Sequence, residues 1–160
     1  MKENALVIHG GAPTAVLNAS LYGVVSQARE YGEIGSVYGA LGGSGGVLRE
    51  RLVDLKAIGA EKLELLLRTP SSAIGTSRDS LEVEDYDRMA EVIARHRIQY
   101  VFINGGNGSM DACGKVYKAC KRRGMGTSVI GIPKTMDNDI AVTDHTPGYG
   151  SAARYVASTV

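Results

Sequence analysis

The residues best suited to chemistry stand together at positions 134–139, which read Lys-Thr-Met-Asp-Asn-Asp. The carboxylates of Asp137 and Asp139 flank an amide, so the pair could bind a cation, or one of them could act as a general base. Transfer of a phosphoryl group to an alcohol needs such a base for the hydroxyl proton, and it needs positive charge beside the transferring group. Lys134 supplies that charge. Asp and Asn are also common turn formers, so a purely structural loop is the alternative.

Four polar loops in the sequence, three of which contain glycine, are suited to binding anions. They are Gly10-Gly11, residues 105–109, residues 133–139 and residues 75–78. Three of them follow apolar runs of strand length, and at the carboxyl ends of parallel strands helix N-termini point backbone amides at anions. The fourth carries Arg78, whose guanidinium suits bidentate phosphate binding. Glycine at such turns also gives plain steric relief, but the loops together favour a polyphosphate ligand or two phosphorylated ligands.

The sequence lacks the motifs of the commoner phosphate and hydrolase sites. The G-x-x-x-x-G-K-[ST] loop is absent, because the stretch from Gly108 to Gly114 is one residue too long and Val116 offers no hydroxyl. No G-x-G-x-x-G opens the first predicted helix, and the spacing G-x-S-x-G occurs at residues 42–46 without a recognisable set of triad partners. The three histidines are scattered and form no triad pattern. A dinucleotide site and serine-hydrolase chemistry are therefore disfavoured.

Length and charge narrow the class of protein. A chain of 160 residues corresponds to one domain, and a net charge of +1 predicts no nucleic-acid partner and no anionic membrane partner. No apolar run is long enough for a membrane span, and the N-terminal run does not resemble a signal peptide, so we expect a cytoplasmic location. Glycine accounts for 21 residues, about twice its usual share of about 7%, which predicts loops that approach a ligand or another backbone closely.

Hydrophobic periodicity predicts strands and helices in alternation. The predicted strands are residues 5–8, 36–40, 100–103 and 128–132, and the predicted helices are residues 13–31, 56–68, 84–97, a segment ending near 123, and a last one starting near 150. Strand, glycine loop and helix in repetition are typical of a parallel α/β sheet. We therefore predict a Rossmann-like three-layer α/β domain with a mostly parallel sheet.

The last predicted helix is still running at Val160. Tyr155 and Val156 have the spacing of inward-facing residues, yet no following segment is present for them to pack against. We expect either a shortened chain or one half of something larger.

These segments resemble a known family, the 6-phosphofructokinases. Residues 131–140, Gly-Ile-Pro-Lys-Thr-Met-Asp-Asn-Asp-Ile, resemble its catalytic-loop motif, which is long and specific. Residues 105–109 resemble its phosphoryl-donor loop, residues 75–78 its arginine-bearing loop, and Gly10-Gly11 with Pro13 and Asn18 its first loop. Residues 143–153 look like the following segment of the pyrophosphate-using branch. The resemblance extends in the right order over essentially the whole chain.

The resemblance implies a fold and a reaction. The chain would be the first half of a two-domain fold, with residues 1–160 forming the donor-binding N-terminal domain with its catalytic loop, and with the C-terminal sugar-phosphate domain absent. The reaction would be the glycolytic transfer of a phosphoryl group from pyrophosphate or ATP to the 1-hydroxyl of fructose 6-phosphate. Mg²⁺ would arrive with the donor phosphates, and the enzyme would be a homo-oligomer. The 160-residue portion would be inactive alone; the alternative is a non-catalytic phosphate-binding, regulatory or assembly domain.

The resemblance also implies residue roles. Asp137 would bind the sugar and deprotonate its 1-hydroxyl, Thr135 would contact the sugar or the transferring phosphoryl group, and Asp139 would be a catalytic neighbour near the metal. Lys134 matches a lysine that many pyrophosphate-using members, and some ATP-using ones, place there. The residues implied to bind the donor phosphates are Gly10, Gly11, Arg78, Gly106, Asn107, Gly108 and Ser109.

Two positions depart from the commonest family pattern. Asn107 stands where an aspartate helps to hold Mg²⁺, so an oxygen ligand is kept but its charge is lost. Gly108 stands where pyrophosphate users place an aspartate that crowds and repels the α-phosphate of ATP, and glycine leaves room for that phosphate. Lys134 and residues 143–155 favour the pyrophosphate branch as ancestry, whereas Gly108 favours ATP, so the donor stays open.

Overall fold

The computed structural model describes residues 2–160, which contain a five-stranded sheet in the order β3-β2-β1-β4-β5. The strands are β1 (Glu3–His9), β2 (Ile34–Ala40), β3 (Leu52–Asp54), β4 (Ile98–Gly105) and β5 (Ser128–Pro133). All neighbouring pairs are parallel except β2 and β3, which run antiparallel. The predicted mostly parallel α/β sheet is confirmed.

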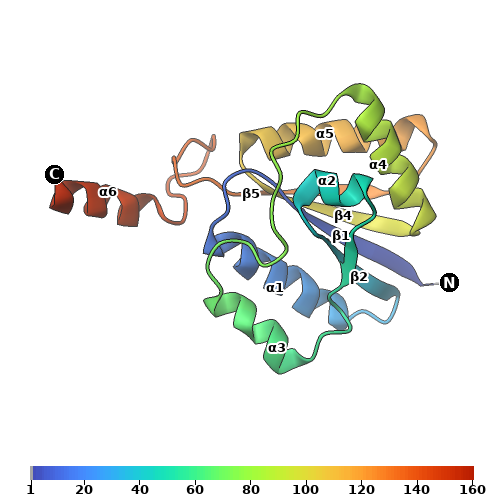
Figure 1. Cartoon of the computed structure of the whole chain (residues 1–160), viewed down its shortest axis with the longest axis horizontal. Helices are drawn as coiled ribbons and strands as arrows, with labels where there is room; N and C mark the ends of the chain where they lie inside the picture. Colours follow the sequence, from blue (N-terminus) through green and yellow to red (C-terminus); the bar gives the residue numbers. More distant parts are fainter. Residues whose placement is uncertain (1) are drawn as a thin grey trace.

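Helices cover both faces of the sheet, as Figure 1 shows. On one face, α2 (Gly43–Leu48), α4 (Val83–Arg95) and α5 (Asn107–Arg122) pack over Leu6 and Ile8 of the central strand. On the other, α1 (Ala15–Arg29) and α3 (Ala60–Glu64) pack over Ala5 and Val7. Alternate residues of β1 point to opposite faces, which is why a continuous apolar run fills two cores.

The helix predicted over residues 56–68 is wrong at its start. The structure has α3 from Ala60, followed by a 3-10 turn at Leu65–Arg68. The backbone N–H of Lys56 donates to the Asp54 carboxylate at 2.9 Å, and its ammonium donates to the backbone carbonyl of Ile34 at 2.5 Å. These bonds hold the chain in a turn beside β3, so the helix can begin only after Gly59.

Two elements, β3 and α2, were not predicted from the sequence patterns. The strand β3 is only three residues long, and α2 forms from the glycine-dense segment that follows β2. A Cβ on Gly46 would lie 2.4 Å from the carbonyl oxygen of Leu41. The glycines of α2 therefore allow a helix to press against the preceding chain, at a place where their low helix propensity predicts a loop.

The last helix, α6 (Tyr149–Thr159), extends away from the sheet at the far left of Figure 1. None of the α6 residues is buried, and Tyr155 and Val156 are 70% and 57% exposed. These two side chains thus pack against no buried surface within residues 2–160, because the segment before α6 carries the helix beyond the sheet. Within residues 2–160, no helix combines the length and apolar character that a bilayer crossing requires.

Candidate functional site

The carboxyl ends of β1 and β4 border a cleft of about 270 Å³. All but one of the residues expected to bind donor phosphates line it; they are Gly10, Gly11, Arg78, Gly106, Gly108 and Ser109. The exception is Asn107, the first residue of α5. The structure thus brings together loops that are distant in sequence, because parallel pairing of β1 with β4 places their carboxyl ends side by side.

The glycines around this cleft differ in whether packing requires them. A Cβ on Gly10 or on Gly105 would lie 2.3 Å from the hydroxyl oxygen of Ser109, so both positions need glycine for the loops to close around that serine. A Cβ on Gly108 would meet no atom within 4 Å. Packing therefore explains Gly10 and Gly105, whereas nothing in the described chain competes for the space above Gly108.

Two serines, Ser44 and Ser77, which were not among the residues expected to bind the donor phosphates, connect the walls of the cleft. The carbonyl of Ser77 accepts from the N–H of Gly11 at 3.4 Å, and its hydroxyl accepts from the N–H of Ser44 at 3.0 Å. Ser77 also forms an isolated parallel bridge with Gly10. The arginine-bearing loop is thereby joined to the β1 loop and to the start of α2. A hydroxyl residue directly before Arg78 was the only sequence signal for this role.

The cleft is suited to anions on electrostatic grounds. Gly108 and Ser109 lie in the first turn of α5, a helix of 16 residues whose N-terminal end carries partial positive charge. Arg78, which also lines the cleft, adds a full positive charge. Asp79 also lines the cleft, so the positive field is local to Arg78 and the α5 terminus.

The acidic segment, residues 134–139, begins directly after β5 ends at Pro133. The N–H of Lys134 donates to the carbonyl of Gly105 at 2.8 Å, and its ammonium donates to the carbonyl of Ala12 at 2.8 Å. Burial lowers the pKa of Lys134 from its ordinary value, and the nearby Asp137 carboxylate acts in the opposite direction. Lys134 therefore ties the acidic segment to both the β4 and the β1 loops.

Within this segment, some side chains form hydrogen bonds that build the turn, and others make none. Asn138 adopts a left-handed φ of 58°, accepts from the N–H of Thr146 at 2.8 Å and donates to the carbonyl of Asp144 at 3.2 Å. Thr135 is nearly buried, and its hydroxyl accepts from the N–H of Asp137 at 3.0 Å. The Asp137 carboxylate is exposed and makes no hydrogen bond or ion pair within residues 2–160. The turn is thus built by its neighbours, and Asp137 is left available.

A side-chain contact joins the acidic segment to the donor loop. The amide nitrogen of Asn107 donates to a carboxylate oxygen of Asp139 at 2.8 Å. No cluster of three His, Cys, Asp or Glu side chains that could hold a metal occurs in the part of the chain that the structure describes. The amide oxygen of Asn107 and the carboxylate of Asp139 offer a partial set of hard oxygen ligands, which suits Mg²⁺ that keeps several ligands from water and substrate phosphates.

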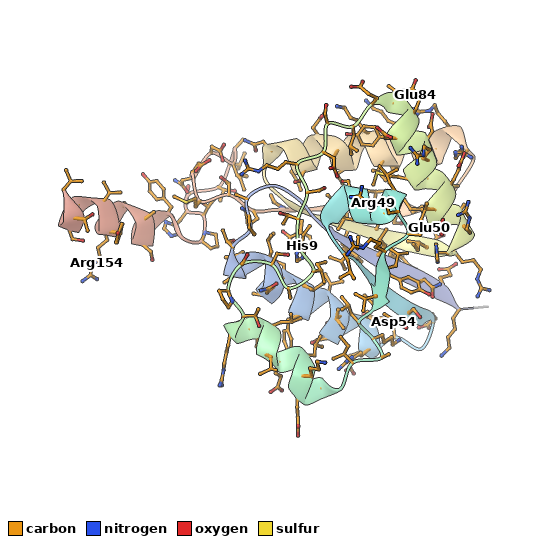
Figure 2. The ribbon with its side chains drawn as sticks, in the orientation of Figure 1. His9, Arg49, Glu50, Asp54, Glu84 and Arg154 are labelled. Carbon is orange, nitrogen blue, oxygen red and sulfur yellow. The ribbon has the colours of Figure 1, made fainter. Side chains whose placement is uncertain are left out.

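His9, labelled in Figure 2, is a buried titratable group at the end of β1. Its Nδ1 lies 2.8 Å from the hydroxyl oxygen of Ser72. Desolvation by burial lowers its pKa from the ordinary 6.5 to about 4. The ring is therefore neutral near pH 7, and His9 adds no charge next to the loop Gly10-Gly11.

The buried state of His9 predicts a pH-dependent stability. The unfolded chain binds the His9 proton more tightly than the folded chain, so the free energy of unfolding should fall as pH drops from 6.5 to about 4 and level off below that. The loss attributable to His9 should reach about 3 kcal/mol. Urea unfolding of the wild type and of His9→Asn between pH 7 and 4 measures it, because the variant lacks this titration. Parallel pH curves for the two proteins would contradict the prediction.

Comparison with known proteins identifies the family to which a chain with these loops belongs. The family model described as Phosphofructokinase matches residues 4–160. The chain belongs to the phosphofructokinase family. The resemblance noted from the motifs is thereby confirmed.

Several phosphofructokinase relatives match almost the whole chain. The pyrophosphate–fructose 6-phosphate 1-phosphotransferases of Rhodospirillum rubrum and Methylococcus capsulatus are 40% and 42% identical over 98% and 99% of it. The crystal structure of pyrophosphate-dependent phosphofructokinase from Nitrosospira multiformis matches 98% of it with a TM-score of 0.89 at 40% identity. An ATP-dependent 6-phosphofructokinase of Amycolatopsis methanolica is 31% identical over 85% of it. The chain spans about two-fifths of the length of these pyrophosphate-dependent relatives, 39% of the first two and 40% of the third.

Proposed function

We propose that this chain is the donor-binding and catalytic-loop portion of a 6-phosphofructokinase. The full-length enzyme would transfer a phosphoryl group from pyrophosphate or ATP to the 1-hydroxyl of fructose 6-phosphate. The observation that carries the proposal is the 2.8 Å contact between Asn107 and Asp139. It holds the acidic segment, with Asp137, against the first turn of the helix that borders the anion-suited cleft.

The proposed mechanism uses the groups of this chain in sequence. Arg78, Ser109 and the amides at the start of α5 bind the donor phosphates in the cleft. Asp137 accepts the proton of the sugar 1-hydroxyl, whose oxygen then bonds to the terminal phosphorus of the donor while the bridging P–O bond breaks. The electron pair of that bond leaves with phosphate from pyrophosphate, or with ADP from ATP.

Two further side chains have supporting roles in this mechanism. Thr135 holds the backbone of Asp137 through the N–H that its hydroxyl accepts, and Lys134 places positive charge between the acidic segment and the β1 loop. Mg²⁺, held by Asn107 and Asp139 together with donor phosphates, would neutralise charge on those phosphates.

The identity of the donor rests on two opposing observations. The relatives with 40% and 42% identity are named as pyrophosphate-using enzymes, which supports that branch as the ancestry. The open space above Gly108 leaves room for the α-phosphate and nucleoside of ATP. We therefore propose a pyrophosphate-branch enzyme whose cleft does not exclude ATP.

We also propose a division of labour within the full-length protein. Residues 1–160 would form its N-terminal donor domain, and a C-terminal domain would supply the groups that bind the sugar phosphate. We expect a cytoplasmic homo-oligomer. The second candidate, a non-catalytic phosphate-binding or assembly domain, is favoured only by Asn107 in place of an acidic metal ligand and by the exposed apolar side chains of α6.

A coupled assay tests this proposal. The full-length gene product, supplied with fructose 6-phosphate and Mg²⁺, is expected to form fructose 1,6-bisphosphate with pyrophosphate or ATP. Residues 1–160 alone are expected to form none, because nothing in them supplies the sugar-phosphate domain. A full-length product that is inactive with both donors would favour the non-catalytic candidate. Turnover by residues 1–160 alone would contradict the division of labour.

A further inference from the structure

Polar side chains are buried beneath the cleft, in a core that is otherwise apolar. His9, Asn18 and Asn104 are completely buried on the face of the sheet that α1 covers, among alanine, valine and leucine side chains. A polar group in such a place costs free energy unless it is hydrogen-bonded. The hydrogen-bond partners of these side chains therefore indicate their structural role.

His9 and Asn18 both bind the irregular segment at residues 69–73. The Asn18 amide donates to the carbonyl of Thr69 and accepts from the N–H of Ala73, each at 2.8 Å, so it brackets the segment from both sides. His9 contacts the hydroxyl of Ser72 between these two points, at 2.8 Å. Residues 69–73 form no helix or strand, so these side-chain bonds take the place of a backbone ladder.

The same segment leads directly to the arginine-bearing loop. The carbonyl of Ser72 accepts from the N–H of Gly75 at 3.2 Å, and the carbonyl of Ile74 accepts from the N–H of Gly42 at 2.8 Å. Ser77 then binds Gly11 as described above. The chain between His9's contact and Arg78 is therefore anchored by hydrogen bonds at Ser72, Ile74 and Ser77, and its backbone connects these points.

We propose that His9 and Asn18 are positioning residues that set the place of Arg78 in the donor cleft by holding residues 69–73. The inference rests on the proposed function, because it takes Arg78 as a ligand of the donor phosphates. His9 and Asn18 lie beneath the cleft on the α1 side and do not line it. Their effect is therefore transmitted through the backbone of residues 72–78.

The unsatisfied atoms around His9 support a role beyond packing. Its Nε2 has no hydrogen-bond partner in the described chain, and neither has the side-chain oxygen of Asn104, its register partner on β4. The two atoms are chemically complementary, because Nε2 can carry a proton to donate and the amide oxygen accepts. A leucine at position 9 would leave no unpaired Nε2, so the imidazole is best explained by its bond to Ser72.

Steady-state kinetics of the full-length enzyme test the proposal, with the donor varied at saturating fructose 6-phosphate. His9→Leu, Ser72→Ala and Asn18→Leu should each raise the donor KM by about fivefold or more, the effect of losing a hydrogen bond, with a change in kcat of less than about threefold. His9→Asn, whose amide reaches the place of Nδ1, should restore the donor KM to within about twofold of the wild type. The double variant His9→Leu/Ser72→Ala should be no worse than the worse single variant, because both remove one contact.

Two matched controls separate the possible outcomes. Val25→Ala truncates a fully buried α1 side chain on the same face, so it should lower the melting temperature without raising the donor KM. Arg78→Ala should raise the donor KM on its own. An unchanged donor KM in Arg78→Ala would mean that the proposed donor site is wrong. A raised KM in Arg78→Ala but not in His9→Leu and Ser72→Ala would overturn the positioning role alone.

Limited trypsin digestion gives a second readout that needs no activity. Cleavage after Arg78 should be faster in Ser72→Ala than in the wild type, because the loop is released locally, while the overall melting temperature changes little. Ser72 is only partly buried, so its alanine variant should fold even if His9→Leu does not. Equal cleavage rates after Arg78 in Ser72→Ala and in the wild type would contradict the proposal.

Discussion

Asp137→Ala in the full-length enzyme is expected to lower kcat by about 10²–10⁴, the range for loss of a positioned acid–base group. The structure leaves the Asp137 carboxylate exposed and without a hydrogen bond in the described chain. Its loss should therefore cost little stability, so the effect falls on the proton-transfer step. The donor KM should change little by comparison, and steady-state kinetics with both substrates varied measure the split between the two parameters.

The matched control for Asp137 is Asp144→Asn. Asp144 is an exposed carboxylate in the neighbouring segment, and its hydrogen bond with Asn138 uses the backbone carbonyl, which the substitution leaves in place. Its kcat should stay within about twofold of the wild type, since exposed substitutions of this kind are nearly neutral. Near-normal turnover in Asp137→Ala would remove the general-base assignment and leave a turn residue.

Gly108→Asp is expected to abolish the use of ATP while sparing the use of pyrophosphate. A side chain at position 108 enters open space, because its Cβ would meet nothing within 4 Å, so the protein itself should accommodate the change. Two like charges about 4 Å apart at an effective dielectric constant near 20 repel by roughly 4 kcal/mol. The kcat/KM for ATP should fall by about two to three orders of magnitude, measured side by side with each donor.

Gly108→Asn is the matched control for this substitution. The amide has nearly the same bulk as the carboxylate but no charge, so it separates crowding from repulsion of the α-phosphate. A loss of ATP use in both variants would assign the effect to bulk, and a loss in the aspartate variant alone would assign it to charge. If Gly108→Asp lowers turnover with both donors equally, then this loop does not select the donor.

The amino-acid sequence by itself determined the layered architecture and the edge at which the candidate site lies. Apolar runs and helical spacing predicted β1, α1, α4 and α5 near their observed bounds, because these elements bury one continuous surface and must repeat with the period of their geometry. Three of the four polar loops followed a predicted strand. In a parallel sheet this order alone sends the loops to a common edge, as Gly10 and Ser109 demonstrate.

Elements stabilised by distant contacts could not be predicted in the same way. The sequence 43–48 has the composition of a loop, yet it forms α2 because Gly46 packs directly against Leu41. The helix expected from residue 56 starts only after Gly59, because side chains hold Lys56 in a turn. In both places, contacts formed in the folded structure override the local helix propensity, and a short stretch of sequence does not reveal such contacts.

For the candidate site too, some features were predicted from the sequence and others were decided by the tertiary structure. The residue types and their order were sufficient to nominate Asp137, Lys134, Arg78 and the start of α5. Only the tertiary structure decided that Asn107 meets Asp139, 32 residues away, and that His9 holds Ser72, 63 residues away. A sequence states which groups are present, whereas the pairing of β4 with β5 and the packing of α1 determine which of them come within hydrogen-bonding distance. Hydrogen bonds act over about 3 Å, so the partners of each group were set by the fold.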